Sequence, residues 1–113
     1  MTLVVFLASA LMCTSDRCYP ALVGQDTPIG RFALHRRLVQ TDGYGGEVLQ
    51  FAETAKEVYA VHRVWLGRPK ERRAERLAQG DASQRRFVTN GCINVAPDVY
   101  ERVAAADSIE IRP

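Results

Sequence analysis

The sequence predicts a small, mostly β domain of the α+β class, with a β-sandwich or mixed sheets and two short helices. Most apolar segments are short and rich in β-branched or aromatic residues, and turn-forming residues separate them. Only two segments combine helix-forming residues with start and stop signals. The 113 residues fit one compact domain, 1–113, and leave no room for a second.

The N-terminal part reads as a hairpin. Leu3–Met12 is apolar, and we interpret it as a buried first strand, because no basic residue precedes it as in a signal peptide and it is too short to span a bilayer. Thr14–Arg17 is a predicted turn, and Cys18–Val23 returns as a second strand. Cys13 and Cys18 then face each other, either as a disulfide or as two buried thiols.

The middle of the chain adds three predicted strands. Arg31–Val39 alternates loosely, and Val48–Phe51 and Glu57–Trp65 are the other two, with a turn or loop at Thr41–Gly46. Alternation in the last strand places His62 on a face with Val58, Ala60 and Val64. The opposite face carries Tyr59, Val61, Arg63 and Trp65.

The C-terminal part contains both predicted helices. Pro69–Ala78 is a basic helix that stops at Gly80, and a second helix starts at Pro97. Ile93–Val95 and Ile109–Ile111 are the remaining strand segments. We expect the second helix to face the core through Val99, Tyr100, Val103 and Ala104.

The charge of the chain argues against a nucleic-acid partner. The formal net charge is +2, and the basic block from Arg63 to Arg86 contains three acidic residues and a single aromatic residue, Trp65. We therefore expect no nucleic-acid binding.

Cys92 and His62 are the residues best suited to chemistry. Cys92 follows Gly91, which allows unusual backbone angles, and N–H groups at such a turn can bind an oxyanion. A neighbouring histidine can activate a thiol. His62 lies on a predicted central strand, whereas His35 lies in an arginine-rich stretch. On these residues alone, a buried cysteine and a structural histidine remain the default interpretation.

Three elements, in this order, resemble the L,D-transpeptidase catalytic domain, also called the YkuD-like domain. Thr27–Phe32 (TPIGRF) is similar to its TPxGxF element, and His62 follows an apolar strand as the family's histidine does. Thr89–Asn94 (TNGCIN) resembles its [S/T]-x-G-C-x-[R/N] motif. The similarity extends over Leu3 to Ile111.

The resemblance implies a cysteine acyltransferase acting on peptidoglycan stem peptides. Cys92 would attack the amide between the third and fourth stem residues, and His62 would move the proton. The backbone N–H groups of Gly91 and Cys92 would bind the oxyanion. Thr89 would support the loop and help to orient His62 or the substrate. The family needs no metal and no organic cofactor, and it acts in the periplasm or cell envelope.

Three departures from the family pattern bear on substrate contacts. Asn94 stands where arginine is common, Asn90 stands where histidine is frequent, and the basic helix Pro69–Ala78 lengthens the gap between histidine and cysteine. The helix is either a lid, a docking face for anionic stems, or a solvated helix with internal ion pairs. Arg63 and Trp65 are candidates for substrate contact or support, and simple packing explains Trp65 equally well.

Two other classes fit the same residues. The first is a hydrolase with the same site: an L,D-carboxypeptidase, an endopeptidase or an amidase, including a secreted antibacterial effector. The second is a catalytically silent peptidoglycan-binding module.

Overall fold

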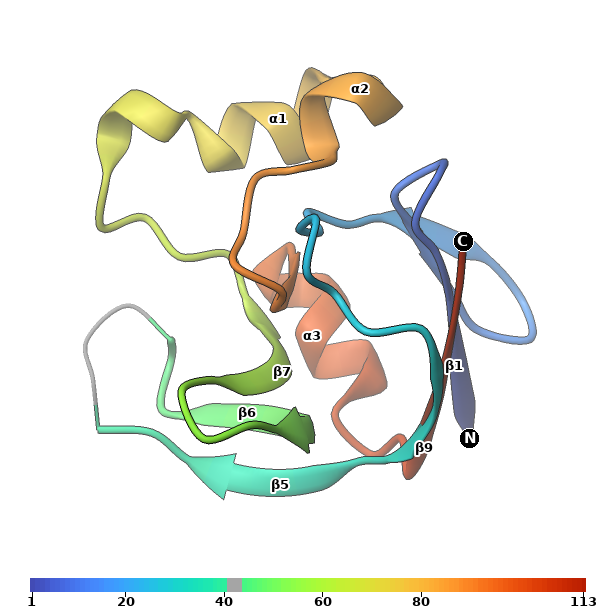
Figure 1. The fold of residues 1–113 in the computed structure, drawn as a ribbon. Coiled ribbons are helices and arrows are strands. Elements are labelled where there is room, and N and C mark those ends of the chain that lie inside the picture. The colour runs from blue at the N-terminus through green and yellow to red at the C-terminus, as the bar shows by residue number, and fades with distance from the viewer. Residues whose placement is uncertain (41–43) are drawn as a thin grey trace.

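A computed structural model of the chain describes residues 1–40 and 44–113. These residues form a mostly β α+β fold with two mixed sheets, one of five strands and one of four, and a few short helices. The predicted fold class is therefore confirmed (Figure 1).

The five-stranded sheet has the order β3-β2-β1-β9-β4. Its last strand along the chain is inserted between two early ones, because β9 pairs in parallel with β1 and antiparallel with β4. Its strands are β1 (Thr2–Phe6), β2 (Leu11–Cys13), β3 (Cys18–Pro20), β4 (Gly30–Ala33) and β9 (Ser108–Arg112).

The four-stranded sheet has the order β5-β6-β7-β8. β8 lies parallel to β7 at one edge, and β5 forms the other edge. Its strands are β5 (His35–Leu38), β6 (Glu47–Glu53), β7 (Val58–Arg63) and β8 (Ile93–Val95).

The helices are η1 (Pro69–Glu71), α1 (Arg73–Gln79), α2 (Ala82–Arg85) and α3 (Pro97–Val103). As predicted, α3 starts at Pro97 and buries Val99, Tyr100 and Val103. The predicted helix Pro69–Ala78 is wrong in its continuity: Arg72 has a left-handed φ of 52°, which separates the 3₁₀ turn from α1. α2 was not predicted, and a capping box between Asp81 and Gln84 starts it.

One apolar core joins both sheets to α3, with Leu3, Leu49, Ile93, Tyr100 and Ile109 among its fully buried members. Figure 1 shows α3 between the strands of the two sheets, while α1 and α2 lie together at the top of the view. A smaller cluster of Leu22, Val64 and Leu77 attaches α1 to the rest of the molecule.

Two predicted strands are each divided. The run Leu3–Met12 is not one strand, because a turn after Phe6 leads to Ala10, which has a left-handed φ of 51°, and β2 then pairs back on β1. No glycine or proline marks this turn. Arg31–Val39 divides at buried Leu34, where the chain passes from one sheet to the other.

The hairpin of β2 and β3 contains a disulfide. Cys13 and Cys18 are a registered pair and are bonded through their sulfur atoms, so the first of the two alternatives is correct. In the predicted loop Thr41–Gly46, residues 41–43 lie outside the described residues. No helix in the described part of the chain is long and apolar enough to cross a membrane.

Candidate active site

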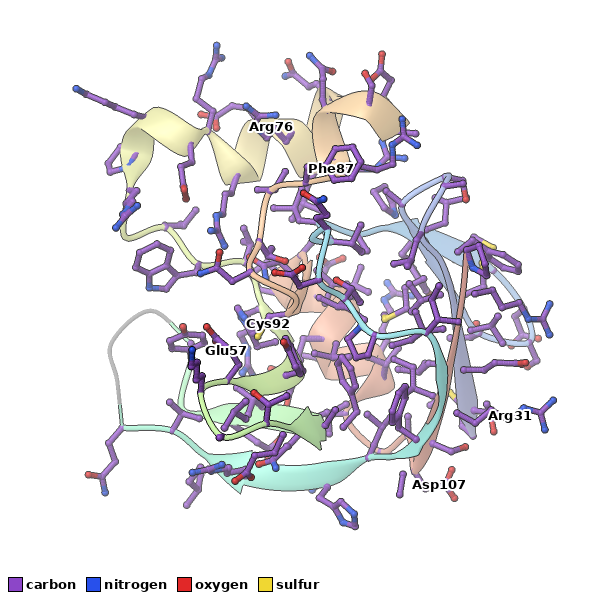
Figure 2. The ribbon with its side chains drawn as sticks, in the orientation of Figure 1. Arg31, Glu57, Arg76, Phe87, Cys92 and Asp107 are labelled. Atoms are coloured by element: carbon purple, nitrogen blue, oxygen red, sulfur yellow. A yellow bond between two sulfur atoms is a disulfide. The ribbon has the colours of Figure 1, made fainter. Side chains whose placement is uncertain are left out.

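Cys92, directly before β8, and His62 of β7 reach one cavity. β7 and β8 are parallel, with His62 in register with Asn94. Side chains alternate along a strand, so Cys92 projects to the same side as Asn94, and Ala60 to the same side as His62. Both Cys92 and His62 line a cavity of about 390 Å³. Figure 2 shows the labelled side chains of Cys92 and Glu57 close together, and the charge of Glu57 acts on the thiol.

The cavity wall is mainly apolar with a few polar groups. Its apolar residues include Leu38 at the end of β5 and Val39 directly after it. Val48 of β6 and Val58 of β7 also line the cavity. The polar lining groups besides the cysteine and histidine are Arg37, Gln40 and Tyr44. An apolar wall with a few convergent polar groups is typical of a small-molecule or peptide site.

The imidazole of His62 is buried, with 2% of the residue exposed. Its Nδ1 lies 2.6 Å from the carbonyl oxygen of Arg63, and its Nε2 lies 3.3 Å from Nδ2 of Asn94. Tyr44 meets the ring edge-on, with 4.6 Å between the ring centroids. The ring is therefore held on three sides.

Asn94 determines which nitrogen of His62 carries the proton. Its Oδ1 accepts from the backbone N–H of Trp65 at 3.3 Å and from Nη1 of Arg73 at 3.0 Å. The NH₂ group of the amide must then face His62, so Nε2 is an acceptor without a proton. It follows that Nδ1 carries the proton and donates it to the carbonyl of Arg63.

The surroundings favour the neutral form of His62. Burial lowers the pKa of the imidazole to about 4, and the positive charge of Arg73 acts in the same direction. The hydrogen bond to the backbone of Arg63 partly opposes this effect.

The thiol of Cys92 also favours its neutral form. Burial raises its pKa, and Glu57 adds to this, whereas the backbone N–H of Ala60 and the charge of Arg73 lower it. The thiol lies 3.5 Å from the carbonyl oxygen of Val58. Within residues 1–40 and 44–113, no hydrogen bond joins the sulfur to His62. The resting pair is thus a neutral thiol and a neutral imidazole.

The loop before Cys92 depends on glycine at position 91. Gly91 has a φ of +131°, and a Cβ there would lie 2.2 Å from the ring of Tyr59. Only glycine fits both constraints. Its carbonyl accepts from the hydroxyl of Thr27 at 2.9 Å, so the TPIGRF segment fixes this loop directly.

Thr89 supports the same loop, as predicted. Its hydroxyl donates to the carbonyl of Cys92 at 2.6 Å and accepts from the N–H of Gly91 at 3.1 Å. The imidazole of His62 is oriented by Arg63 and Asn94, and a role of Thr89 toward the substrate stays a prediction.

Of the two predicted oxyanion donors, the N–H groups of Gly91 and Cys92, one already has a hydrogen-bond acceptor. The N–H of Gly91 is already bonded to Thr89. The N–H of Cys92 has no acceptor among the residues that the structure describes, so it is the donor that can meet an oxyanion.

Three predicted contact residues lie outside the cavity lining. The side chain of Arg63 points to the opposite face, where it pairs with Glu101 and lies 4.2 Å from the ring centroid of Tyr100, whereas its backbone carbonyl supports the imidazole of His62. Asn90 is exposed. Trp65 packs under Arg73, with 5.2 Å from the guanidinium carbon to the ring centroid.

Arg73 and Tyr44 were not predicted as site residues, and no role was predicted for Thr27. The basic character of the insertion Pro69–Ala78 was the one signal for Arg73, and it does not indicate which arginine reaches the site. The insertion is not simply a solvated helix, although its pair between Arg73 and Glu71 exists at 2.9 Å. Arg73 is 12% exposed and Leu77 is buried, so α1 is packed against the site.

No protein-family model, no curated protein and no solved structure matches the chain. The described residues also contain no cluster of three or more His, Cys, Asp or Glu side chains arranged to hold a metal ion.

Proposed function

We propose that the protein is a cysteine acyltransferase that acts on peptidoglycan stem peptides, as an L,D-transpeptidase does. The observation that carries this proposal is that Cys92, directly before β8, and His62 of the adjacent β7 line one cavity. The resemblance of Thr27–Phe32 and Thr89–Asn94 to that family's motifs supplies the substrate class.

The reaction follows from the order of the groups. Sγ of Cys92 attacks the amide carbonyl, and its proton moves to Nε2 of His62, which exchanges the hydrogen bond from Asn94 for one from the thiol. The N–H of Cys92 stabilises the oxyanion. The C–N bond then breaks, and the proton passes to the leaving amine. An acceptor amine attacks the thioester, the C–S bond breaks, and a proton returns to the sulfur.

The neutral resting pair gives this mechanism a pH dependence. Because both groups start neutral, the proton leaves the thiol during the attack and not before it. Activity requires unprotonated His62, whose pKa is lowered to about 4. We expect activity to fall on the acid side only as the pH approaches that value.

Two features support an anionic substrate outside the cytoplasm. Arg37 lines the cavity and can attract the carboxylates of stem peptides. The Cys13–Cys18 disulfide is characteristic of an oxidising compartment. Together with the family resemblance, they favour the periplasm or cell envelope.

The test is incubation with purified disaccharide-tetrapeptides followed by mass analysis. We expect crosslinked dimers, together with loss of the terminal D-residue. Tripeptides without dimers would instead assign the site to a hydrolase. The Cys92→Ala variant should give neither product, and His62→Ala should be slower by roughly 10²–10⁴-fold. Unchanged tetrapeptide with the folded wild-type protein, or products from Cys92→Ala, would contradict the proposal.

A further inference from the structure

We propose that Arg73 of α1 is a positioning residue for this site. Its guanidinium holds the amide of Asn94 with the NH₂ group toward His62 and thereby keeps Nε2 of the imidazole free of a proton. The inference rests on the proposed function, because it concerns the same cysteine–histidine pair.

Arg73 is fixed from three directions. Its Nη1 donates to Oδ1 of Asn94 at 3.0 Å, and its Nε donates to Oε1 of Glu71 at 2.9 Å. Its guanidinium also packs over the ring of Trp65. An arginine held by bonds in fixed directions presents its charge at one place, which a flexible lysine does not.

The amide of Asn94 cannot reverse without loss. Asn94 is fully buried, with 0% exposure. If the amide turned over, its NH₂ group would face the guanidinium of Arg73 and the N–H of Trp65, both of which are donors. A buried polar group without a hydrogen-bond partner destabilises the arrangement that contains it. Arg73 supplies the shorter of the two bonds that prevent this reversal.

The charge of Arg73 also acts on both reacting groups. It lowers the pKa of His62 and the pKa of Cys92. Among residues 1–40 and 44–113, the other charged or titratable groups near this pair are Tyr44 from the loop before β6, Arg37 from β5 and Glu57 from the turn before β7.

Removal of Arg73 and removal of Glu71 should therefore have opposite effects. Without Arg73, the pKa values of His62 and Cys92 should both rise, because a positive charge is lost and Glu71 becomes unpaired. Without Glu71, the charge of Arg73 is no longer offset, and both titrations move to lower pH. A merely structural role for the helix would not produce shifts of opposite sign.

The experiment uses the full chain without reductant, so that Cys13 and Cys18 stay bonded and Cys92 is the remaining thiol. Iodoacetamide alkylation is measured against pH, and His62 is titrated by NMR, which also reports the protonated nitrogen. The variants are Arg73→Gln, Arg73→Lys, Glu71→Gln and, as a control from the same helix, Arg76→Gln. Arg76 bonds to the carbonyls of Glu71 and Gln84 and has no hydrogen bond to Asn94.

We expect Arg73→Gln to lower the alkylation rate at about pH 7 by roughly threefold or more, which corresponds to half a pKa unit. His62 should titrate at higher pH in the same variant and gain a population protonated at Nε2. Glu71→Gln should shift both titrations downward, Arg73→Lys should fall between wild type and Arg73→Gln, and Arg76→Gln should match wild type.

Unmoved titrations in Arg73→Gln and Glu71→Gln would overturn the role of Arg73, even if turnover of stem peptides is found. If Arg73→Gln does not fold, the directions of Glu71→Gln and Arg73→Lys decide the question. A wild-type Cys92 that stays unreactive at every pH would instead count against the proposed function. The two failures are thus distinguishable.

Discussion

At the scale of single residues, the site depends on which groups donate hydrogen bonds. Trp65 and Arg73 are both donors to one oxygen of Asn94, and that arrangement determines the protonated nitrogen of His62. The histidine is therefore kept neutral by burial and by its neighbours together.

The first residue-scale prediction concerns acid stability. The pKa of His62 is about 4 in the folded protein and 6.5 as an ordinary value, so the unfolded chain binds this proton more tightly. The contribution to stability is fully present above about pH 6.5 and is lost as the pH falls toward 4, a change on the order of 3 kcal/mol. Urea unfolding between these pH values should show this slope in wild type.

His62→Gln removes the titrating group and should flatten this part of the profile. The carboxylates with lowered pKa values, such as Asp107 and Glu110, remain in both proteins and so do not affect the comparison. Parallel pH profiles for the two proteins would show that His62 is not buried as a neutral ring.

The second residue-scale prediction concerns Gly91. Gly91→Ala adds a methyl group 2.2 Å from the ring of Tyr59 at a φ of +131°. We expect the free energy of unfolding to fall by roughly 2–4 kcal/mol, from overpacking and backbone strain together. Gly46→Ala is the matched control, because its φ is +92° and no atom lies within 4 Å of the added methyl. Equal losses in both variants would exclude the ring contact as a cause.

At the scale of elements, the segment between β7 and β8 is anchored by two arginines, of which Arg85 is buried and Arg73 is partly buried. Arg73 of α1 reaches Asn94, and Arg85 of α2 donates to the carbonyls of Ser9 and Ala10. Leu77 adds apolar contacts with Leu22 and Val64. The segment is thus attached to both sheets, although its outer surface is charged.

The β2–β3 hairpin gives a prediction at this scale. Its disulfide closes a short loop, and replacing Cys13 and Cys18 together by alanine should cost about 2 kcal/mol of stability. Because neither residue lines the cavity, the pH dependence of Cys92 alkylation should stay the same. Thermal unfolding and alkylation of the double variant measure both quantities. A changed alkylation profile would mean that the hairpin and the site are coupled.

At the scale of the whole molecule, the features that could be predicted from the sequence are those that short-range residue patterns determine. Alternation along Glu57–Trp65 placed His62 on the correct face, and Pro97 marked the start of α3. The sequence does not reveal that the chain changes sheets at Leu34, because the residues before and after it continue the same loose alternation. The reach of Arg73 could not be read either, since it depends on where a helix packs and not on local sequence.

The position of β9 has a consequence for how this molecule is made. β9 fills the space between β1 and β4, and Thr2 and Ser108, 106 positions apart, bring their hydroxyls within 2.6 Å. A nascent chain still lacking Ser108–Arg112 leaves the backbone edges of β1 and β4 without a neighbour. Such edges can accept a strand from another copy, so we expect domain-swapped pairs to form more readily before β9 is in place.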